Sequence, residues 1–417
     1  MVNATKRVYA TQPSTNITSL DGKRYLQSGF DAAQKWLTNG LGFKEVDINK
    51  VANNKTGVLG HPIYAYQNAQ RSAPAVSYLQ AVLNRTNFHL QLNTRVLRVE
   101  RSGTRATGVM ILLPNGQNTT IALRSASSRV ILSGGALFTP ALLMFSGIGP
   151  LADLERLRDA NKLAPYINST KAYIVNNSTG VGLFDNPNTF IELSGPSIQS
   201  FSYMYNITAP EASQYLQQKS GPYTFAGQTT AFWDTMTRPN GSVAAFQGTI
   251  GTSGFGAYTN SSTITLNIYG TSGLKSSGKV VLDSKFVPGP SGSVLYSDPQ
   301  DAKDIAAFIY KIFQALPASG AGLTPLNIAQ NSTAAQIEQY ITSYTEYTRG
   351  YVNHWSSSCR IGKCVDKSLK VIGTNGLYVM DSSVLEPLTT NPMMGTMIVA
   401  EKGIEGILRG LKLWKDI

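Results

Sequence analysis

Residues 129–150 read RVILSGGALFTPALLMFSGIGP and decide the fold class of this chain. Residues 129–132 are apolar after the first position, which is typical of a strand buried on both faces in a parallel sheet. Thr139-Pro140 predicts a helix start, because Thr is a favoured N-cap and Pro is tolerated in the first helical turn. Gly147 predicts the end of that helix. The stretch therefore predicts a strand, a short turn and a helix in succession.

The turn inside this stretch consists of small residues. Gly134, Gly135 and Ala136 let a backbone approach a ligand closely, and a following helix start offers free N–H groups to negative charge. A strand–Gly-Gly–helix unit of this kind suits a phosphate or an extended cofactor. A tight packing turn without a ligand is the other interpretation, and the residues of this unit alone leave both open.

A second stretch, residues 351–408, carries a candidate catalytic base. His354 lies between Asn353 and Trp355 and is one of three histidines in 417 residues. Imidazole titrates near neutral pH, so it can accept a proton in catalysis. A lone histidine is more often a structural group, and its two neighbours are equally compatible with simple packing.

The same stretch predicts a helix start close to the end of a strand. Residues 376–381 have a strand pattern, and Asn391-Pro392 follows across a polar turn. Asn is a favoured N-cap, Pro fits the first helical position, and the apolar spacing up to Leu408 is helical. Because a helix N-terminus carries partial positive charge, this arrangement predicts a site where negative charge collects. A plain capping role for Asn391 is compatible with the same pattern.

The composition fits a globular protein with more than one folding unit. The chain has 417 residues, of which 42% are hydrophobic and 14% charged, and domains usually run to roughly 100–200 residues. Its net charge of +12 is spread along the chain without a run of five Lys or Arg. Nucleic-acid binders cluster their charge, so this pattern argues against a nucleic-acid partner. No apolar run reaches the roughly 18–20 residues of a membrane span.

Frequent Asn-x-Ser/Thr triplets and a close cysteine pair predict a secreted, extracellular glycoprotein. Cys359 and Cys364 are the only cysteines, and in an oxidising compartment they can close a small loop after His354. A metal site is the weaker interpretation. The N-terminal residues do not form a signal peptide, so we expect the true N-terminus to be missing. The triplets begin at Asn3, Asn16, Asn54, Asn84, Asn118, Asn168, Asn176, Asn177, Asn206, Asn240, Asn260 and Asn331.

Alternating patterns elsewhere predict further strands and helices. Strands are predicted at 88–92, 95–99, 107–112 and 119–123, the last two joined by a hairpin turn, and at 262–269 and 278–283. Helices are predicted at 30–37, 75–83 and 301–315 from their apolar spacing. We therefore expect a mixed α+β or α/β fold with two modules interleaved along the chain.

Several motifs resemble the glucose–methanol–choline family of FAD-dependent alcohol oxidoreductases. The sixteen residues from Gly135 to Pro150 match the family's second signature almost residue for residue. The Asn-His pair, with residues 60–62 and 71–74, resembles most closely the flavin-containing part of cellobiose dehydrogenases. The other family-like residues are Asn353, His354, Trp355, residues 377–383 and Thr390-Asn391-Pro392.

The resemblance implies a partial FAD-binding domain interleaved with an antiparallel-sheet-plus-helices substrate domain. Family members begin with a Rossmann unit carrying G-x-G-x-x-G, a pattern that this sequence does not contain. We therefore expect the N-terminal Rossmann half to be missing and the chain to be a truncated part of a larger enzyme. The expected segments are 1–60 (peripheral, substrate side), 61–155 (FAD domain), 156–345 (substrate domain) and 346–417 (FAD domain with the catalytic pair).

The resemblance also implies roles for individual residues. His354 is expected to accept the hydroxyl proton of an alcohol whose carbon gives hydride to the flavin. Asn391 is expected to hydrogen-bond the same hydroxyl, and Asn353 to contact the substrate. FAD is the expected cofactor, a sugar or alcohol and an external electron acceptor are the expected partners, and no metal is expected. The expected cofactor contacts are Val96 (adenine), Gly134, Gly135 and Ala136 (turn), Asp381 and Ser382 (ribityl and diphosphate), and Pro392 and Met393 (reduced flavin).

Three functions are therefore compatible with the sequence. The first is a secreted FAD-dependent sugar dehydrogenase that acts on the anomeric hydroxyl of cellobiose or similar oligosaccharides. The second is an aryl- or aliphatic-alcohol oxidase of the same family, which requires an apolar substrate pocket. The third is a non-catalytic secreted glycan-binding protein that has lost its flavin. The polar middle of the chain, with its scattered aromatic residues, favours the sugar substrate.

Overall fold

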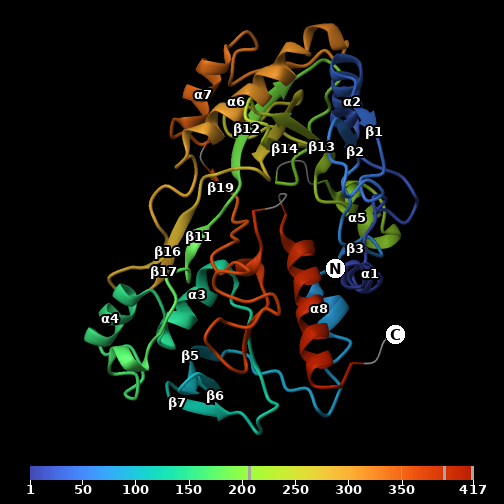
Figure 1. Cartoon of the computed structure of the whole chain (residues 1–417). Helices are drawn as coiled ribbons and strands as arrows, with labels where there is room; N and C mark the ends of the chain where they lie inside the picture. The colour runs from blue at the N-terminus through green and yellow to red at the C-terminus, as the bar shows by residue number, and fades with distance from the viewer. Residues whose placement is uncertain (205–207, 349, 388–390, 415–417) are drawn as a thin grey trace.

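The computed structural model describes residues 1–204, 208–348, 350–387 and 391–414, which form two lobes (Figure 1). The large-sheet lobe, at the top of Figure 1, is a mainly antiparallel sheet covered by helices. The small-sheet lobe, at the bottom, combines several short sheets with helices. This arrangement confirms the predicted mixture of helices and sheets.

In the described part of the chain, the large-sheet lobe is built on an eight-stranded sheet. The strand order is β1-β2-β13-β14-β15-β12-β18, with β19 paired to β12, and only β1 and β2 run parallel. Its strands are β1 (Lys44–Glu45), β2 (Val58–Gly60), β12 (Pro187–Ser194), β13 (Gln228–Thr237), β14 (Val243–Gly251), β15 (Thr263–Gly270), β18 (Thr324–Pro325) and β19 (Gly350–Tyr351). Its helices are α2 (Ser28–Leu41), α6 (Pro299–Gln314) and α7 (Ala334–Thr342).

One face of this sheet forms the largest hydrophobic core of the described chain. Side chains alternate along a strand, and on this face Phe246 and Leu266 are fully buried. Trp36 of α2 and Phe308 of α6 belong to the same core, and the rings of Phe246 and Phe308 stack with centroids 4.5 Å apart. Removal of this apolar surface from water is the main term that stabilises the lobe.

The opposite face of the sheet is polar and aromatic. Asn188 lies directly across from Tyr269 in the pairing of β12 with β15, and Phe190 lies across from Asn267. Directly paired residues project from the same side of a sheet, so these four side chains share one face. The ring centroid of Tyr269 lies 6.4 Å from that of His354. The polar face is therefore the one beside the candidate base.

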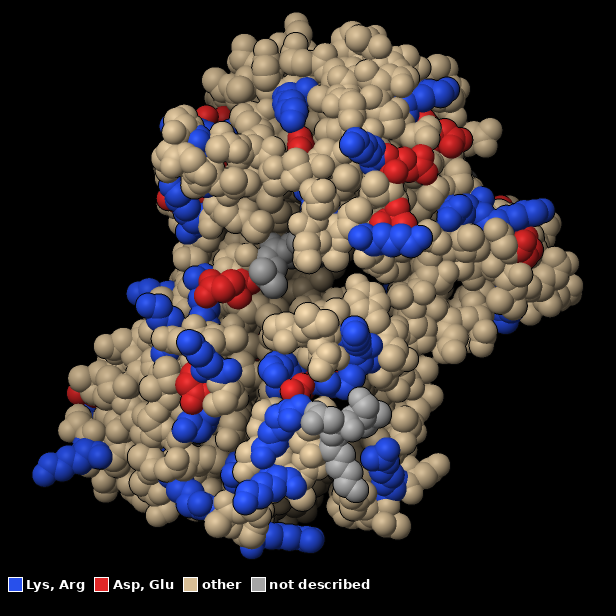
Figure 2. All heavy atoms as spheres, turned by 45° about the vertical axis from the view of Figure 1, so that its right-hand side comes forward, with Lys and Arg blue, Asp and Glu red and all other residues tan. Residues whose placement is uncertain are grey.

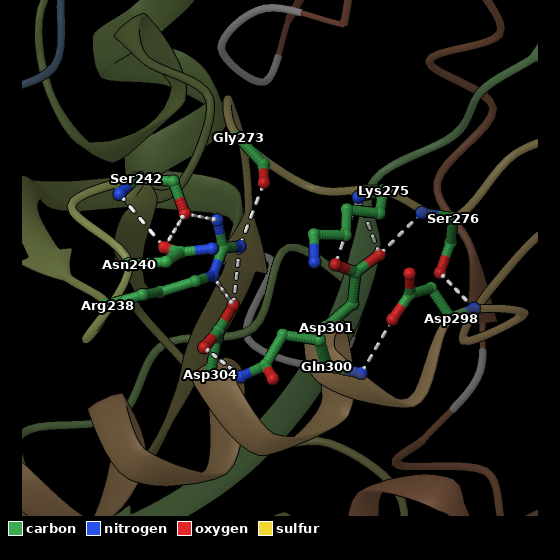
Figure 3. A network of polar contacts seen from close by, with 10 residues as sticks. All are labelled: Arg238, Asn240, Ser242, Gly273, Lys275, Ser276, Asp298, Gln300, Asp301 and Asp304. Atoms are coloured by element: carbon green, nitrogen blue, oxygen red, sulfur yellow. Dashed lines mark hydrogen bonds and ion pairs between the residues drawn. The ribbon is translucent and has the colours of Figure 1, made fainter.

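A buried polar network fixes α6 to the turn after β13 (Figure 3). Asp304 of α6 accepts two hydrogen bonds from Arg238, at 2.6 Å from Nη2 and 2.8 Å from Nε. One turn earlier, Asp301 accepts the backbone N–H groups of Lys275 and Ser276. Charged groups at this depth are tolerated because each of them has hydrogen-bond partners.

The small-sheet lobe contains the stretch that opened the sequence analysis. Its meander of β5 (Arg95–Ser102), β6 (Arg105–Leu112) and β7 (Asn118–Ala122) confirms the strands predicted between 95 and 123. β8 (Val130–Leu132) pairs in parallel with β20 (Leu377–Val379), as its apolar pattern predicts. The prediction that both faces of this strand are buried is wrong, because Ile131 is exposed. The lobe also contains α1 (Val2–Thr11), α3 (Gly135–Phe145), α4 (Leu151–Asp159), α8 (Met393–Gly410), β9 (Ile148–Gly149), β10 (Ile174–Val175), β11 (Val181–Leu183), β16 (Gly278–Leu282) and β17 (Pro288–Pro290).

Two further features tie this lobe together. Cys359 and Cys364 form a disulfide, which confirms the predicted small loop. α1 packs on α8, where Arg7 forms ion pairs with Glu401 at 2.8 Å and Glu405 at 2.9 Å. The remaining elements are α5 (Ala209–Gln218), β3 (Tyr66–Gln67) and β4 (Gln70–Arg71).

Four other local predictions are wrong. α3 begins at Gly135 rather than after Thr139, and Pro140 lies inside it. Residues 88–92 form no strand, although all of them are described. The helix predicted at 75–83 is a single π-helical turn, Ala75–Leu79, and α8 begins at Met393 without a capping side chain. In α3, the hydroxyl of Thr139 donates a hydrogen bond to Asp381 at 2.6 Å. The hydroxyl that the local pattern assigned to an N-cap is therefore bound by a residue that is distant in sequence.

The lobes are not contiguous blocks of sequence. Residues 44–60 add β1 and β2 to the large sheet, whereas residues 278–290 lie in the small-sheet lobe as β16 and β17. The four segment boundaries given above therefore stay a prediction.

Candidate functional site

The main chain at His354 is held by a buried carboxylate just before β12. Asp185 accepts the N–H groups of Asn353 at 3.2 Å and of His354 at 2.9 Å, and that of Asn186 at 2.9 Å. Asp185 is 1% exposed, and burial raises its pKa to about 6 although the backbone hydrogen bonds act in the opposite direction. The carboxylate therefore fixes the position of the candidate base through its backbone.

The imidazole of His354 contacts groups from three parts of the chain. Its Nδ1 lies 3.3 Å from Oδ1 of Asn186 and 3.5 Å from the backbone N of Asn391. Its ring is tilted against Tyr269 of β15. Burial lowers the pKa of His354 below the ordinary histidine value. A lowered pKa keeps the ring neutral near physiological pH, which is the form that accepts a proton.

The structure brings Asn391 to His354 through its backbone. Asn391 is exposed and has a φ of 59°, and the residue at the N-cap of α8 is Pro392. The prediction that Asn391 caps α8 is therefore wrong, because its left-handed conformation places it before the helix. The predicted pair meets in space at the start of α8, as expected. Contact of both side chains with one substrate hydroxyl stays a prediction, and Thr390 lies outside the described residues.

The other two residues of the Asn-His-Trp motif contact each other. Asn353 is exposed, and its Oδ1 accepts from Nε1 of Trp355 at 3.1 Å. Asn353 also has a φ of 60°, a conformation that asparagine tolerates better than most residues. The substrate contact predicted for Asn353 stays a prediction, and the structure shows in addition a local role.

The small residues after β8 form the turn that the sequence predicts. Gly135 has a φ of +77°, which favours glycine, and a Cβ at this position would meet no atom within 4 Å. Gly134 precedes it as the N-cap of α3. Ala136 is buried, and its carbonyl accepts from Oγ of Ser358 at 2.5 Å. The turn therefore leaves open space above Gly135 while its far side is packed.

Asp381 at the end of β20 fixes this turn. Its carboxylate accepts from the N–H of Gly135 at 3.0 Å, from Oγ1 of Thr139 at 2.6 Å and from the N–H of Ser383 at 2.8 Å. Asp381 is 5% exposed. The carboxylate therefore ties the first turn of α3 to the segment that follows β20, a role that the sequence did not predict.

One extended segment connects the turn to the candidate base. Immediately after the Asn-His-Trp motif, Ser356 bridges to Phe184, and the N–H of Ser357 donates to the carbonyl of Ser382 at 3.2 Å. Ser358 then reaches Ala136 as described above. The expected cofactor contacts at the turn and at Ser382 are therefore tied directly to the segment that carries His354.

Val96 of β5 lines a cavity of about 600 Å³ between β5, α3 and the β16–β17 turn. Among the residues that the structure describes, its lining includes the basic residues Arg95, Arg98, Lys162 and Lys285 and no acidic residue. In Figure 2, Lys and Arg side chains are also frequent over the small-sheet lobe, and the surface is hollowed between the lobes. Basic surroundings of this kind suit an anionic group.

The sequence did not indicate Asp185 and Asn186. They precede β12 in an Asp-Asn-Pro sequence and lie 168 residues or more from His354 in sequence. The one available clue was that polar pair at a strand start, which resembles many ordinary turns. Only the pairing of β12 within the large sheet brings them to the base.

Comparison with known proteins identifies the family. Models of the GMC oxidoreductase family match residues 32–176 and 275–400. The chain belongs to this family, which confirms the resemblance. The first of these models describes the N-terminal part of the family, so the prediction that this part is missing is wrong. Closeness to cellobiose dehydrogenases in particular stays a prediction.

Two relatives of this chain are named as an oxidase and a dehydrogenase. Choline oxidase of Arthrobacter globiformis is 27% identical over 360 residues, which cover 80% of this chain and 58% of that protein. Dehydrogenase pkfF of Emericella nidulans is 26% identical, with 90% of this chain and 64% of that protein covered. The chain therefore spans less than two thirds of the length of these relatives.

Solved structures confirm the fold class. Formate oxidase of Aspergillus oryzae has a TM-score of 0.77 at 18% identity, with 97% of this chain and 74% of that chain covered. A fungal aryl-alcohol oxidase has a TM-score of 0.70 at 18% identity, with 93% and 71% covered. At these identities the likeness shows the fold alone.

Family membership supports FAD as the cofactor, and the residues present fit it. Open space lies above Gly135, where an added Cβ would meet nothing, and a helix start lies beside His354. The cavity at Val96 offers basic side chains to an anionic group. Across the described ranges, no group of three His, Cys, Asp or Glu is arranged to hold a metal. In the same part of the chain, no helix combines the length and apolar character that crossing a membrane requires.

Proposed function

We propose that this chain is the base-carrying part of a FAD-dependent oxidoreductase that oxidises the CH–OH group of a polar alcohol, with a cellobiose-type sugar as the first candidate. The observation that carries this proposal is the meeting of His354 and Asn391 at the start of α8, 3.5 Å apart between Nδ1 and the backbone N. The family match supplies the reaction class. An external electron acceptor completes the proposed reaction.

The proposed division of labour follows from the chemistry of the groups. FAD, when bound, takes up the hydride. His354 accepts the hydroxyl proton, because burial keeps its imidazole neutral. The N–H groups at the start of α8, from Met393 onward, favour negative charge close to the base. Asn391 orients the hydroxyl through its exposed carboxamide.

The polar face of the large sheet supports a sugar substrate. Asn267 is half-buried on this face and accepts from Nδ2 of Asn188 at 3.2 Å. Carboxamides both donate and accept hydrogen bonds, which suits ligands with many hydroxyl groups. We propose that these carboxamides contact the part of the sugar that does not react.

An aryl- or aliphatic-alcohol oxidase is the second candidate, and one observation favours it. Phe190 lies on the same face, and its ring meets that of Phe255 edge-on with centroids 5.1 Å apart. Tyr347 extends the cluster, 6.0 Å from Phe255. An aromatic substrate could pack against such rings.

We also propose that the protein is a secreted glycoprotein. None of the described triplet asparagines is buried, and nine of them, Asn3, Asn54, Asn84, Asn118, Asn168, Asn177, Asn240, Asn260 and Asn331, are exposed. The disulfide between Cys359 and Cys364 supports an oxidising compartment. Mass spectrometry before and after removal of N-linked glycans from the natively expressed protein tests this proposal, and an unchanged mass would contradict it.

The function is tested by spectroscopy with two substrates. We expect the purified chain, incubated with FAD and desalted, to keep the yellow flavin absorbance and to lose it when cellobiose is added without oxygen. Bleaching by benzyl alcohol alone would support the second candidate. A colourless protein that binds cello-oligosaccharides would support the third function, the glycan-binding protein, and overturn the proposal. His354→Ala is the matched control: it should keep the absorbance and bleach about 100-fold or more slowly.

A further inference from the structure

Two buried residues, Asp185 and Asn186, lie beside the candidate base and are not part of the division of roles proposed above. Asp185 and Asn186 are each 1% exposed. Asp185 binds the backbone at His354, as described above, whereas Asn186 faces the ring itself with its Oδ1 3.3 Å from Nδ1. A buried carboxamide next to an imidazole determines which ring nitrogen carries the proton.

The orientation of the Asn186 carboxamide is fixed by a second hydrogen bond. Its Nδ2 donates to the carbonyl of Gly270 at 2.8 Å. Exchange of the two amide ends would place an oxygen against that carbonyl, so Oδ1 is the atom that faces His354. Oδ1 can only accept, and Nδ1 must therefore carry a hydrogen for this contact to be a hydrogen bond.

A competing contact requires the opposite tautomer. The backbone N–H of Asn391 lies 3.5 Å from the same Nδ1 and could donate to it only if Nδ1 had a lone pair. The two contacts cannot be satisfied together by a neutral ring. Asn391 is exposed, so its N–H can bind water instead, whereas the buried Oδ1 of Asn186 has no such alternative. Leaving the buried Oδ1 of Asn186 without a donor costs more free energy than leaving the exposed N–H of Asn391 to water. The hydrogen bond between Nδ1–H and Asn186 therefore forms in preference to the contact with Asn391.

We propose that Asp185 and Asn186 are positioning residues that hold the neutral ring of His354 as its Nδ1–H tautomer, which makes Nε2 the proton acceptor. Asp185 fixes the backbone from which the ring projects, and Asn186 fixes the hydrogen on Nδ1. When Nε2 takes up a proton, the Nδ1–H bond to Asn186 persists. The assignment of Nε2 as the catalytic acceptor rests on the proposed function, whereas the tautomer does not.

The tautomer is measured directly by NMR, without flavin or turnover. The chain has three histidines, so a long-range ¹H–¹⁵N spectrum of the ¹⁵N-labelled full chain at pH 8 contains few ring signals. A spectrum of His354→Gln identifies those of His354 by their disappearance. We expect a protonated, pyrrole-type ¹⁵N shift for Nδ1 and a pyridine-type shift for Nε2. The reverse pattern in the unmodified chain would overturn the proposal.

Two variants test whether Asn186 is the cause. Asn186→Ala should move His354 toward the Nε2–H tautomer that free imidazole side chains prefer. Asn186→Asp keeps an acceptor at the same place, so it should retain Nδ1–H and raise the pKa of His354 by about one unit or more, because a carboxylate stabilises the imidazolium. A pH titration of the same ring signals gives that pKa, and the second variant keeps the test decisive where the first fails to fold.

The control variant is Asn188→Ala, at the second residue of β12. Asn188 donates to Asn267 at 3.2 Å and, among the described residues, makes no hydrogen bond to His354, so the tautomer and pKa of His354 should not change. A tautomer unaffected by Asn186→Ala, or a pKa unaffected by Asn186→Asp, would contradict the proposal. A chain that fails to bind FAD but shows Nδ1–H would contradict the proposed function alone.

Discussion

The two lobes of this protein differ in how they enclose their apolar side chains. The large-sheet lobe has one large core in which residues from α2, α6, α7 and the sheet are fully buried, and a small second cluster around Trp233. The small-sheet lobe has several smaller clusters. Its strand β8 and helix α3 leave Ile131 39% and Phe138 56% exposed. The small-sheet lobe, which carries most of the expected cofactor contacts, therefore has the smaller and more divided hydrophobic core.

This difference in packing bears on how the residues of the candidate site are held in place. On the sheet side, Asp185 and Asn186 are buried at the start of β12 and hold the candidate base in place. On the cofactor side, Asp381 holds the turn at Gly135, and the disulfide closes a short loop after His354. Stability measurements in the two lobes test the contrast.

The largest effect is expected in the core of the large-sheet lobe. Phe308→Ala removes a fully buried ring that stacks on Phe246, and we expect it to lower the free energy of unfolding by about 3–5 kcal/mol. Urea denaturation followed by circular dichroism measures this change. The matched control is Phe138→Ala in α3, where the ring is exposed and the loss should stay within about 0.5 kcal/mol. Equal losses would remove the distinction between the lobes.

The ion pair in Figure 3 should give the next largest effect. Arg238→Met leaves Asp304 buried without its charged partner, and we expect a loss of roughly 3 kcal/mol. The double variant Arg238→Met with Asp304→Leu should recover most of that loss, because no buried charge remains. Thermal unfolding of both variants measures the difference. A double variant as unstable as the single one would show that the pair contributes net stability.

A pH-dependent effect is expected at Glu192 on the polar face. Burial raises its pKa from 4.5 to about 7, although Phe255 and Thr265 donate hydrogen bonds to it. The folded state therefore holds a proton between pH 4.5 and 7 that the unfolded state releases, so this group's stabilisation is complete below pH 4.5 and is lost as pH rises through 7. The loss amounts to at most roughly 3 kcal/mol.

Glu192→Gln tests whether this group lowers the free energy of unfolding as the pH rises. The uncharged side chain should remove this contribution, so the variant should lose less stability than the unmodified chain between pH 5 and pH 8. Urea midpoints at the two pH values give the comparison, and the difference between the proteins cancels the other titrating groups. A steeper fall in the variant would contradict the assignment.

The smallest effect is expected from the disulfide of the small-sheet lobe. Cys359 and Cys364 are five residues apart, and so short a loop stabilises by only about 2 kcal/mol in the chain-entropy model. The variant with both cysteines replaced by Ser should show a loss of that size in denaturant titrations. A much larger loss would show that this loop supports the segment between His354 and Ser382 beyond its entropic effect.

The sequence by itself determined the elements whose pattern is local. The apolar run at 130–132, the alternation from 95 to 123 and the helical spacing of α6 all gave the correct element, because side-chain period follows backbone geometry within a few residues. The motif carrying His354 and its approach to Asn391 were also predicted, through the family resemblance. The close cysteine pair indicated the disulfide correctly.

Only the tertiary structure decided which residues hold the turn and the candidate base in place. Asp381 reaches Gly135 across 246 residues and Asn186 reaches His354 across 168, and no local pattern encodes such a pairing. The same kind of distant contact explains why Thr139 lies inside α3, contrary to its capping propensity. Capping preferences are worth about 1 kcal/mol, so a buried partner brought by the fold readily overrides them.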